Sequence, residues 1–300
     1  MVHTKIWNGE LVREYLFMSE ASMLISLKSV QQRLLKGAGV YHRLKMSWLY
    51  DAYWTIANKE IVRGKQAEAR FYRELLRGFQ PGNLIFDIGA NVGFKTAAFL
   101  KLGAKVIAVE PDEYNQEILR RSFLEYRLAK KAVIIVGKAV SDKAGTEEIW
   151  IDAPGSAKNT LSAKWVGLLR EDEQRFGARL NFSNKKTVET TTLEDLIAKF
   201  GLPFFIKIDV EGYEPEVLRG LRQPVPYVSF EVNLPEFMSE GEQCVELLAD
   251  LSPNSKFNYA VNSERGLELK NWIRRTEFLE TLNKCSAPSI EVFWTSQENI

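Results

Sequence analysis

Short apolar, β-branched runs alternate with helix-forming segments over the last three quarters of the chain. Each run is hydrophobic at nearly every position, as expected of a strand that is covered on both faces of a sheet. Runs of this kind predict strands at residues 84–88, 105–110, 133–139, 204–209 and 227–231. The segments between and after them predict helices at residues 94–102, 115–126, 193–200 and 242–251.

This alternation of strands and helices is typical of βαβ units, which build parallel sheets. Two alternating runs, near residues 257–261 and 289–295, predict antiparallel strands that complete the sheet. We therefore predict an α/β protein with a doubly wound, Rossmann-like sheet. The sheet is expected to be mostly parallel, with a C-terminal antiparallel strand.

The regions outside this alternation predict two additions to the sheet domain. Apolar residues recur at three- and four-residue spacings over residues 11–35 and 41–79, which predicts amphipathic helices. Residues 1–80 are thus expected to form an N-terminal helical extension, and residues 81–300 the Rossmann-like domain. A polar, β-leaning stretch at about 147–192 interrupts the alternation and predicts an insertion.

Composition and charge narrow the classes of partner. The 300 residues are 45% hydrophobic and carry 40 Lys and Arg against 39 Asp and Glu, so the net charge of +1 gives no reason to expect nucleic acid. Two cysteines, Cys244 and Cys285, fit a reducing, cytoplasmic setting. We expect no membrane span, because no apolar run approaches the roughly 20 residues required, and no signal peptide.

A glycine turn follows the first predicted strand directly. The strand ends at Asp87, and Gly89, Asn91 and Gly93 lie in the turn before the next helix. Glycines here let the backbone turn tightly and approach a ligand. The G-x-x-x-G spacing and the acidic residue both disfavour a pyrophosphate, whereas a carboxylate suits a cationic group such as the sulfonium of S-adenosylmethionine.

Polar residues also follow the second and third strands. Glu110, with Pro111 behind it, comes about twenty residues after the turn, where a carboxylate can accept the hydroxyls of a ribose. A carboxylate that only caps the next helix is the alternative. Ser141 and Asp142 follow the third strand and could bond an adenine edge, although a simple turn explains them nearly as well.

Acidic residues gather after the fourth and fifth strands. Asp209 and Glu211 alternate along extended backbone and share one face, and Glu231 ends the next strand. Methyl transfer to a hydroxyl needs alignment and a proton acceptor. Asp209 is the first candidate for that base and Glu211 the second, as a base or a substrate anchor. Such acids could also bind Mg²⁺ or Ca²⁺, but acids bonded to backbone amides are the simpler interpretation, so no metal site is assigned.

Four stretches together resemble the FkbM-type methyltransferases, over about residues 65–235. They are Phe86-Asp87-Ile88-Gly89-Ala90-Asn91-Val92-Gly93, Val109-Glu110-Pro111, Ala139-Val140-Ser141-Asp142 and Lys207-Ile208-Asp209-Val210-Glu211-Gly212-Tyr213-Glu214. The resemblance implies a class I methyltransferase sheet, S-adenosylmethionine as donor, and O-methylation of a hydroxyl on a sugar, polyketide or other metabolite.

Site roles follow from the same resemblance, position by position. Asp87, Gly89, Asn91 and Gly93 would line the methionine part of the donor, and Glu110 the ribose. Ser141 and Asp142 would contact the adenine, and Asp209 and Glu211 would face the transferred methyl and the acceptor. In similar proteins a glutamate ahead of the first strand helps to hold the donor, and Glu68 lies at the corresponding place.

Two other functions stay open at this point. A nucleotide-cofactor oxidoreductase shares the glycine turn and the acidic residue after the second strand. A non-catalytic protein that kept the donor-binding fold is the other, because fold alone does not establish activity. The sequence leaves open the identity of the small-molecule or glycan acceptor, oxygen versus nitrogen as the methylated atom, and the oligomeric state, a homodimer being one option.

Overall fold

A computed structural model describes residues 59–171, 180, 182 and 184–297. The helices predicted at residues 11–35 lie outside the described part. The first section of the predicted helical stretch at 41–79, up to residue 58, also lies outside it. The end of the second predicted stretch is helix α4 (Lys59–Leu75). Among the described residues, none of the helices has both the length and the hydrophobicity needed to cross a bilayer.

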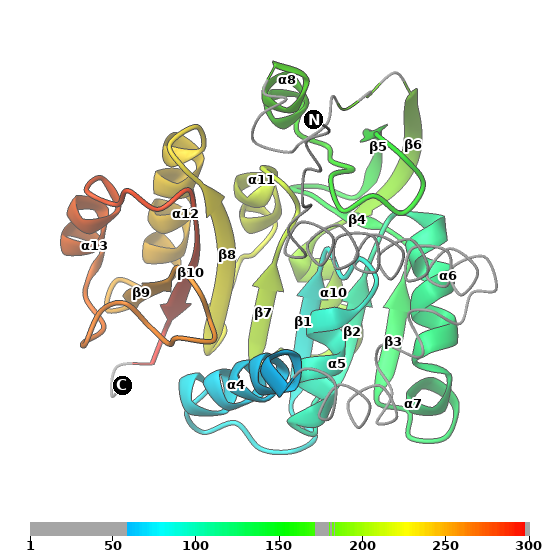
Figure 1. Ribbon diagram of the computed structural model, residues 1–300, viewed down its shortest axis with the longest axis horizontal. Helices are drawn as coiled ribbons and strands as arrows, with labels where there is room; N and C mark the ends of the chain where they lie inside the picture. Colours follow the sequence, from blue (N-terminus) through cyan, green and yellow to red (C-terminus); the bar gives the residue numbers. More distant parts are fainter. Residues whose placement is uncertain (1–58, 172–179, 181, 183, 298–300) are drawn as a thin grey trace, which may run out of the picture.

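The main sheet has seven strands in the order β3-β2-β1-β7-β8-β10-β9 (Figure 1). Their bounds are β1 (Leu84–Ile88), β2 (Lys105–Val109), β3 (Val133–Val136), β7 (Phe205–Ile208), β8 (Tyr227–Asn233), β9 (Lys256–Ala260) and β10 (Ser289–Thr295). Strand β10 runs antiparallel to both neighbours, and the pairings among β3, β2, β1, β7 and β8 are parallel. The predicted fold class is confirmed, including the C-terminal antiparallel strand.

The prediction of a single strand at residues 133–139 is wrong. It divides into β3 (Val133–Val136), which pairs with β2, and β4 (Ala139–Val140), which pairs with β6 (Asn184–Thr191). Strand β6 also pairs with β5 (Gly145–Ile151), which gives a second, three-stranded sheet (Figure 1). Gly137 and Lys138 interrupt the apolar run between the two strands, and this break is where the chain changes sheet.

Helices cover both faces of the main sheet, as the near-continuous hydrophobicity of its strands requires. Successive β1 residues show the two faces. Ile85 belongs to the core that contains residues of helices α4, α5 and α6, whereas Phe86 belongs to the core that contains residues of α8, α10, α11, α12 and α13. The bounds of these helices are α5 (Phe94–Lys101), α6 (Glu113–Ser122), α8 (Ala163–Glu171), α10 (Leu193–Phe200), α11 (Glu214–Arg219), α12 (Met238–Leu251) and α13 (Arg275–Leu282). The predicted helix at 115–126 is instead two, because α6 ends at Ser122 and α7 (Leu124–Leu128) begins after Phe123.

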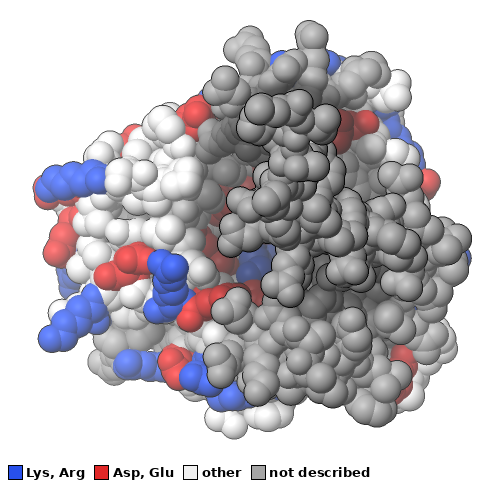
Figure 2. Space-filling view, in the orientation of Figure 1, with Lys and Arg blue, Asp and Glu red and all other residues white. Residues whose placement is uncertain are grey.

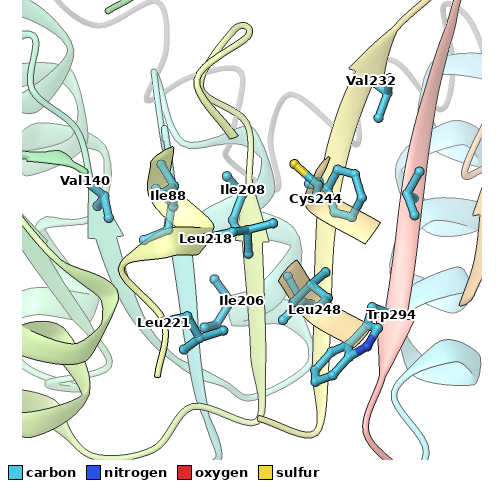
Figure 3. Close-up of a cluster of buried hydrophobic side chains, with 14 of the residues drawn as sticks. Ile88, Val140, Ile206, Ile208, Leu218, Leu221, Val232, Cys244, Leu248 and Trp294 are labelled. Carbon is cyan, nitrogen blue, oxygen red and sulfur yellow. The ribbon is translucent and has the colours of Figure 1, made fainter. Parts of the chain in front are cut away.

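The larger hydrophobic core lies between the sheet and α10–α13. Figure 3 shows Ile206 and Ile208 of β7 in this core together with Leu218 of α11 and Leu248 of α12. On the other face, Tyr72 of α4 is fully buried in the core that includes strands β1 and β2. Helix α4 therefore shares the core of the sheet, while the proposed domain limits at residue 80 and at 147–192 remain predictions.

The order of the strands reverses beside β1, which lies between β2 and β7. The chain leaves β1 toward β2 and later returns on the other side to β7. In open α/β sheets this reversal opens a crevice at the carboxyl ends of the strands. On the described part of the face in Figure 2, basic and acidic side chains are interspersed, in agreement with the nearly balanced charge.

Candidate active site

The turn after β1 depends on glycine at one position. Gly89 has φ +78°, and a Cβ there would lie 1.9 Å from the carbonyl oxygen of Asp209. The N–H groups of Gly89 and Ala90 both donate to the carbonyl of Val109 at 3.0 Å. Backbone from β1, β2 and β7 thus converges at the turn, and a side chain at residue 89 would force it apart.

Glu110 is fixed beside this turn by two backbone donors. Its oxygens accept the N–H groups of Asn91 and Asp112, both at 2.8 Å, and the residue is 6% exposed. Burial raises the pKa of Glu110 to about 7, although the two hydrogen bonds oppose this shift. A carboxylate has about four acceptor sites, so the group can still accept a hydroxyl of a ligand.

A cleft of about 720 Å³ opens over the carboxyl ends of β1, β2 and β7. The structure places six of the predicted site residues in the wall of this first cleft: Gly89, Asn91, Glu110, Pro111, Asp209 and Glu211.

Asn115 is a further residue of the first cleft that sequence reasoning did not identify. It lies on α6 and is 2% exposed, and its side chain bonds Glu110. Its side-chain oxygen has no hydrogen-bond partner among the described residues. A buried acceptor without a partner is costly, so a ligand N–H or O–H in the cleft would stabilise it. An asparagine in a helix carries no sequence signal for this role.

Asp87 and Gly93, which were predicted to bind the methyl donor, lie beneath the turn and not in the wall of the first cleft. Asp87 is 1% exposed and accepts the Thr96 hydroxyl at 2.5 Å; burial raises its pKa. Gly93 has φ +91°, and a Cβ there would meet the rings and methyls of Phe123 and Leu119. Both residues shape the turn and the start of α5.

The predicted adenine contacts are also absent from the cleft wall. Ser141 is fully buried and donates to Glu147 at 2.6 Å, and Asp142 is exposed. Tyr213 donates to the same glutamate at 2.6 Å. The cleft is lined here by Lys138, Ala139 and Val140. Because β4 enters the second sheet, Ser141 turns toward β5 and away from the cleft.

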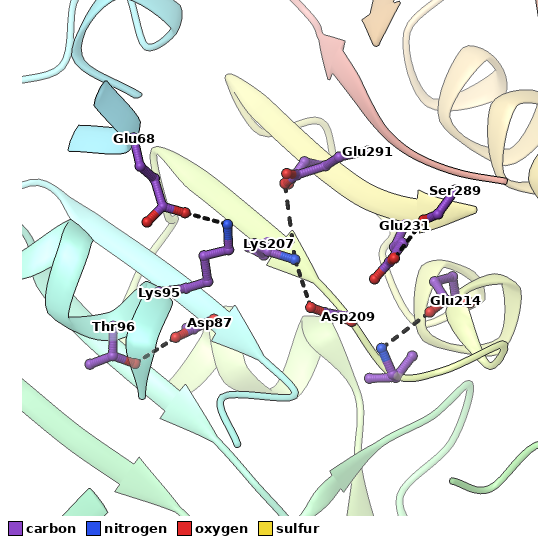
Figure 4. Close-up of polar contacts among 12 residues, drawn as sticks. Glu68, Asp87, Lys95, Thr96, Lys207, Asp209, Glu214, Glu231, Ser289 and Glu291 are labelled. Carbon is purple, nitrogen blue, oxygen red and sulfur yellow. Dashed lines mark hydrogen bonds and ion pairs between the residues drawn. The ribbon is translucent and has the colours of Figure 1, made fainter. Parts of the chain in front are cut away.

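A row of charged side chains crosses the sheet on the face of α4 and α5 (Figure 4). The Lys207 ammonium on β7 is 3.1 Å from Asp209 Oδ2 and 4.0 Å from Glu291 Oε1 on β10. Glu68 of α4 pairs with Lys95 of α5 at one end of the row. The structure therefore places Glu68 in this row, outside the wall of the first cleft.

This row forms part of a second cleft of about 700 Å³. Its wall comes from α5, β7 and the residue Asp209 after it, β8, the end of β9 and the segment that follows, and β10. The residues are Lys95, Lys207, Asp209, Glu231, Ala260, Val261, Asn262, Ser263, Ser289, Ile290 and Glu291. Asp209 lines both clefts. Among the described residues, Asp209 is the one that the walls of the two clefts share.

The acids between the clefts differ in pKa. Burial acts to raise the pKa of Asp209, but the Lys207 ammonium lowers it, and the net shift is downward. Burial raises the pKa of Glu231 to about 7 and that of Glu214 to about 8. Glu211, with φ +57°, has its pKa raised well above the ordinary value by burial and by the neighbouring carboxylates.

Within the described residues, no group of three or more His, Cys, Asp or Glu side chains has a geometry that could hold a metal ion. The acids instead bond to neighbouring groups of the protein. Glu214 accepts the backbone N–H of Val210 at 3.1 Å and of Gly212 at 3.3 Å.

Comparison with known proteins gives the family. Residues 87–270 match the methyltransferase FkbM domain. The 31-O-demethyl-FK506 methyltransferase FkbM of Streptomyces tacrolimicus is 32% identical over 183 residues, which are 51% of this chain and 69% of that protein. The hexuronic acid methyltransferase AglP of Haloferax volcanii is 24% identical over 188 residues, 61% of this chain and 70% of that protein.

A solved structure of methyltransferase FkbM from Methylobacillus flagellatus aligns with 86% of this chain at 13% identity and a TM-score of 0.47. The chain spans 58% of the length of that structure. The domain match, by contrast, covers more than half of the 300 residues and includes the glycine turn, Glu110, and the acids at 209, 211 and 231. The chain therefore belongs to the FkbM methyltransferase family and is a methyltransferase enzyme.

Proposed function

We propose that the protein transfers a methyl group from S-adenosylmethionine to a hydroxyl of a small-molecule or glycan acceptor. The observation that carries this proposal is that Asp209 lines two clefts at once. A methyl donor in the first cleft and an acceptor in the second would meet beside one carboxylate. In-line displacement at carbon needs this end-to-end arrangement of the two substrates.

The residues of the first cleft fit the donor. Gly89 presents bare backbone, Glu110 keeps an acceptor site for a ribose hydroxyl, and Asn115 offers an unpartnered buried oxygen. S-adenosylmethionine supplies a methyl group on a positively charged sulfur. Asp209 and Glu211 line the same cleft, and their carboxyl groups favour a cation there.

The second cleft fits a hydrophilic acceptor. Two lysines, three acids, two serines and Asn262 supply donors and acceptors around it, and none of the described residues in its wall is aromatic. The names of the two relatives refer to a demethylated FK506 compound and to a hexuronic acid. A hydroxyl on a sugar-like or polyketide acceptor agrees with both observations.

A nucleotide-cofactor oxidoreductase is less consistent with the first cleft. Glu110, Asp209 and Glu211 line it against a single lysine, Lys138, among the described wall residues. A diphosphate would meet these acids where it needs cations or free N–H groups. The predictions of a cytoplasmic location, of no nucleic-acid partner and of a possible dimer remain predictions from the sequence.

Calorimetric titration tests the donor. S-adenosylmethionine and its demethylated product S-adenosylhomocysteine should bind, and NADH should not. Glu110→Gln should weaken donor binding, whereas Glu117→Gln, on the exposed surface of α6, should leave it unchanged. Binding of NADH without binding of either sulfur compound would refute the proposal.

Methyl transfer is tested with a donor that carries an isotopically labelled methyl group. The enzyme is incubated with D-glucuronic acid and, separately, with cell extract, and mass spectrometry locates the label. Labelled methyl on a hydroxyl oxygen is the expected product. Donor binding without label transfer in either incubation would favour the non-catalytic alternative.

A further inference from the structure

Glu231 lies at the carboxyl end of β8 and lines the second cleft. Its Oε1 accepts the Ser289 hydroxyl at 2.7 Å, and a side-chain hydrogen bond joins it to Asp209 (Figure 4 shows the three residues). Among the described residues, it is absent from the wall of the first cleft, which holds Asp209 and Glu211. Its carboxyl group therefore faces the side where the acceptor would bind.

Asp209 is already engaged by a cation. Lys207 is 3% exposed, and its ammonium lies 3.1 Å from Asp209 Oδ2. This ion pair stabilises the ionised form of Asp209 and lowers its pKa. A carboxylate with a low pKa is a weak proton acceptor, because efficient bases have a pKa near the working pH.

Glu231 has the opposite environment. It is partly buried, Asp209 carries a like charge beside it, and the neutral hydroxyl of Ser289 donates to it. Burial and Asp209 together raise the pKa of Glu231 to about 7. When two neighbouring carboxyl groups have well-separated pKa values, the group with the lower pKa stays ionised and the group with the higher pKa accepts the proton.

On the basis of the proposed methyl transfer, we propose that Glu231 is the base that removes the proton of the acceptor hydroxyl, and that Asp209 is a positioning residue. As the acceptor oxygen bonds to the methyl carbon, the carbon–sulfur bond breaks and its electron pair stays on sulfur. The hydroxyl proton moves to the carboxylate of Glu231, which becomes neutral. Protonated Glu231 then donates to the Asp209 carboxylate until the proton leaves to solvent.

Several charged groups surround Glu231 and set the direction of its titration. They are Lys207 on β7, Asp209 and Glu211 in the loop after it, Glu214 at the start of α11, Lys95 on α5 and Glu291 opposite Glu231 on β10. Lys207 lowers the pKa of Glu231, and burial and Asp209 raise it. If Asp209 became neutral, Lys207 would act mainly on the remaining acids, and the pKa of Glu231 would fall.

The kinetic experiment compares three variants with D-glucuronic acid as the acceptor and a labelled methyl donor. Glu231→Gln should lower kcat by about 10²- to 10⁴-fold, with the donor Kd unchanged. In wild type, kcat should rise tenfold per pH unit below about pH 7 and then level off. Asp209→Asn should shift this rise of kcat to lower pH, and Glu231→Gln should abolish it. Glu246→Gln, on the exposed face of α12, is the matched control and should match wild type.

A second experiment needs no acceptor. Protein labelled with ¹³C at the glutamate carboxyl carbons is titrated by NMR, and the signal missing in Glu231→Gln identifies Glu231. A midpoint near pH 7 is expected, and a midpoint below about pH 5, closer to an ordinary glutamate, would overturn the assignment. Wild-type turnover retained in Glu231→Gln would also overturn it. Lack of donor binding in wild type would instead refute the proposed function, so the two failures can be told apart.

Discussion

Replacement of Lys207 by methionine should destabilise the protein. The Lys207 ammonium is 3% exposed and lies 3.1 Å from Asp209 and 4.0 Å from Glu291. At an effective dielectric constant of about 20, these two attractions amount to about 5 and 4 kcal/mol. Release of the lysine from its own desolvation offsets much of this, and Asp209 is 34% exposed and partly screened. We expect a net loss of about 3 kcal/mol, at the lower end for a broken buried pair.

The loss should depend on pH in a defined direction. In wild type, Lys207 holds the pKa of Asp209 below its ordinary value, so this stabilisation exists at neutral pH and disappears as the pH falls through the folded-state pKa. In Lys207→Met, burial dominates and raises the pKa of Asp209. As the pH falls, Asp209 becomes protonated, and the cost of its unpaired buried charge disappears. The difference between wild type and variant should therefore be larger at pH 8 than at pH 5.

Urea denaturation followed by circular dichroism measures this difference. Arg275→Met is the control, because Arg275 forms an ion pair of 2.9 Å with Glu246 in which both side chains are 47% exposed. Such a surface pair should contribute less than about 1 kcal/mol. If Lys207→Met costs no more than Arg275→Met, or if its cost is the same at pH 5 and pH 8, the electrostatic account of this row is refuted.

Three further variants test other parts of the structure. Gly89→Ala should lower the affinity for the methyl donor at least tenfold, as measured by calorimetry, because its Cβ would lie 1.9 Å from the Asp209 carbonyl oxygen. Gly167→Ala is the control and should bind the donor normally, because a Cβ there meets open space. Equal affinities in the two variants would contradict the turn geometry. Donor affinity should rise between pH 6 and 8 as Glu110, with a pKa of about 7, ionises and accepts the ribose hydroxyls, and this dependence should vanish in Glu110→Gln. Leu248→Ala, at a fully buried position, should cost about 2–5 kcal/mol in urea denaturation, and a cost below 1 kcal/mol would argue against the packing in Figure 3.

The local signals in the sequence predicted the sheet and much of the first cleft. Hydrophobic runs marked the strands, and a glycine turn after β1 marked the place where backbone can approach a ligand. Acids that follow parallel strands lie at one sheet edge whatever the details of packing. For this reason Gly89, Asn91, Glu110 and Asp209 all line one cleft, although the role of each remains a prediction.

The tertiary structure alone decided which side chains share an environment. Ser141 looked like a ligand residue, but the pairing of β4 with β6 turns it toward Glu147. Asp209 looked like the base, but the fold places the Lys207 ammonium beside it and leaves Glu231 paired with a serine hydroxyl. Strand pairing, burial and the pKa of an acid depend on residues far apart in the chain, and a local sequence pattern carries no information about those contacts.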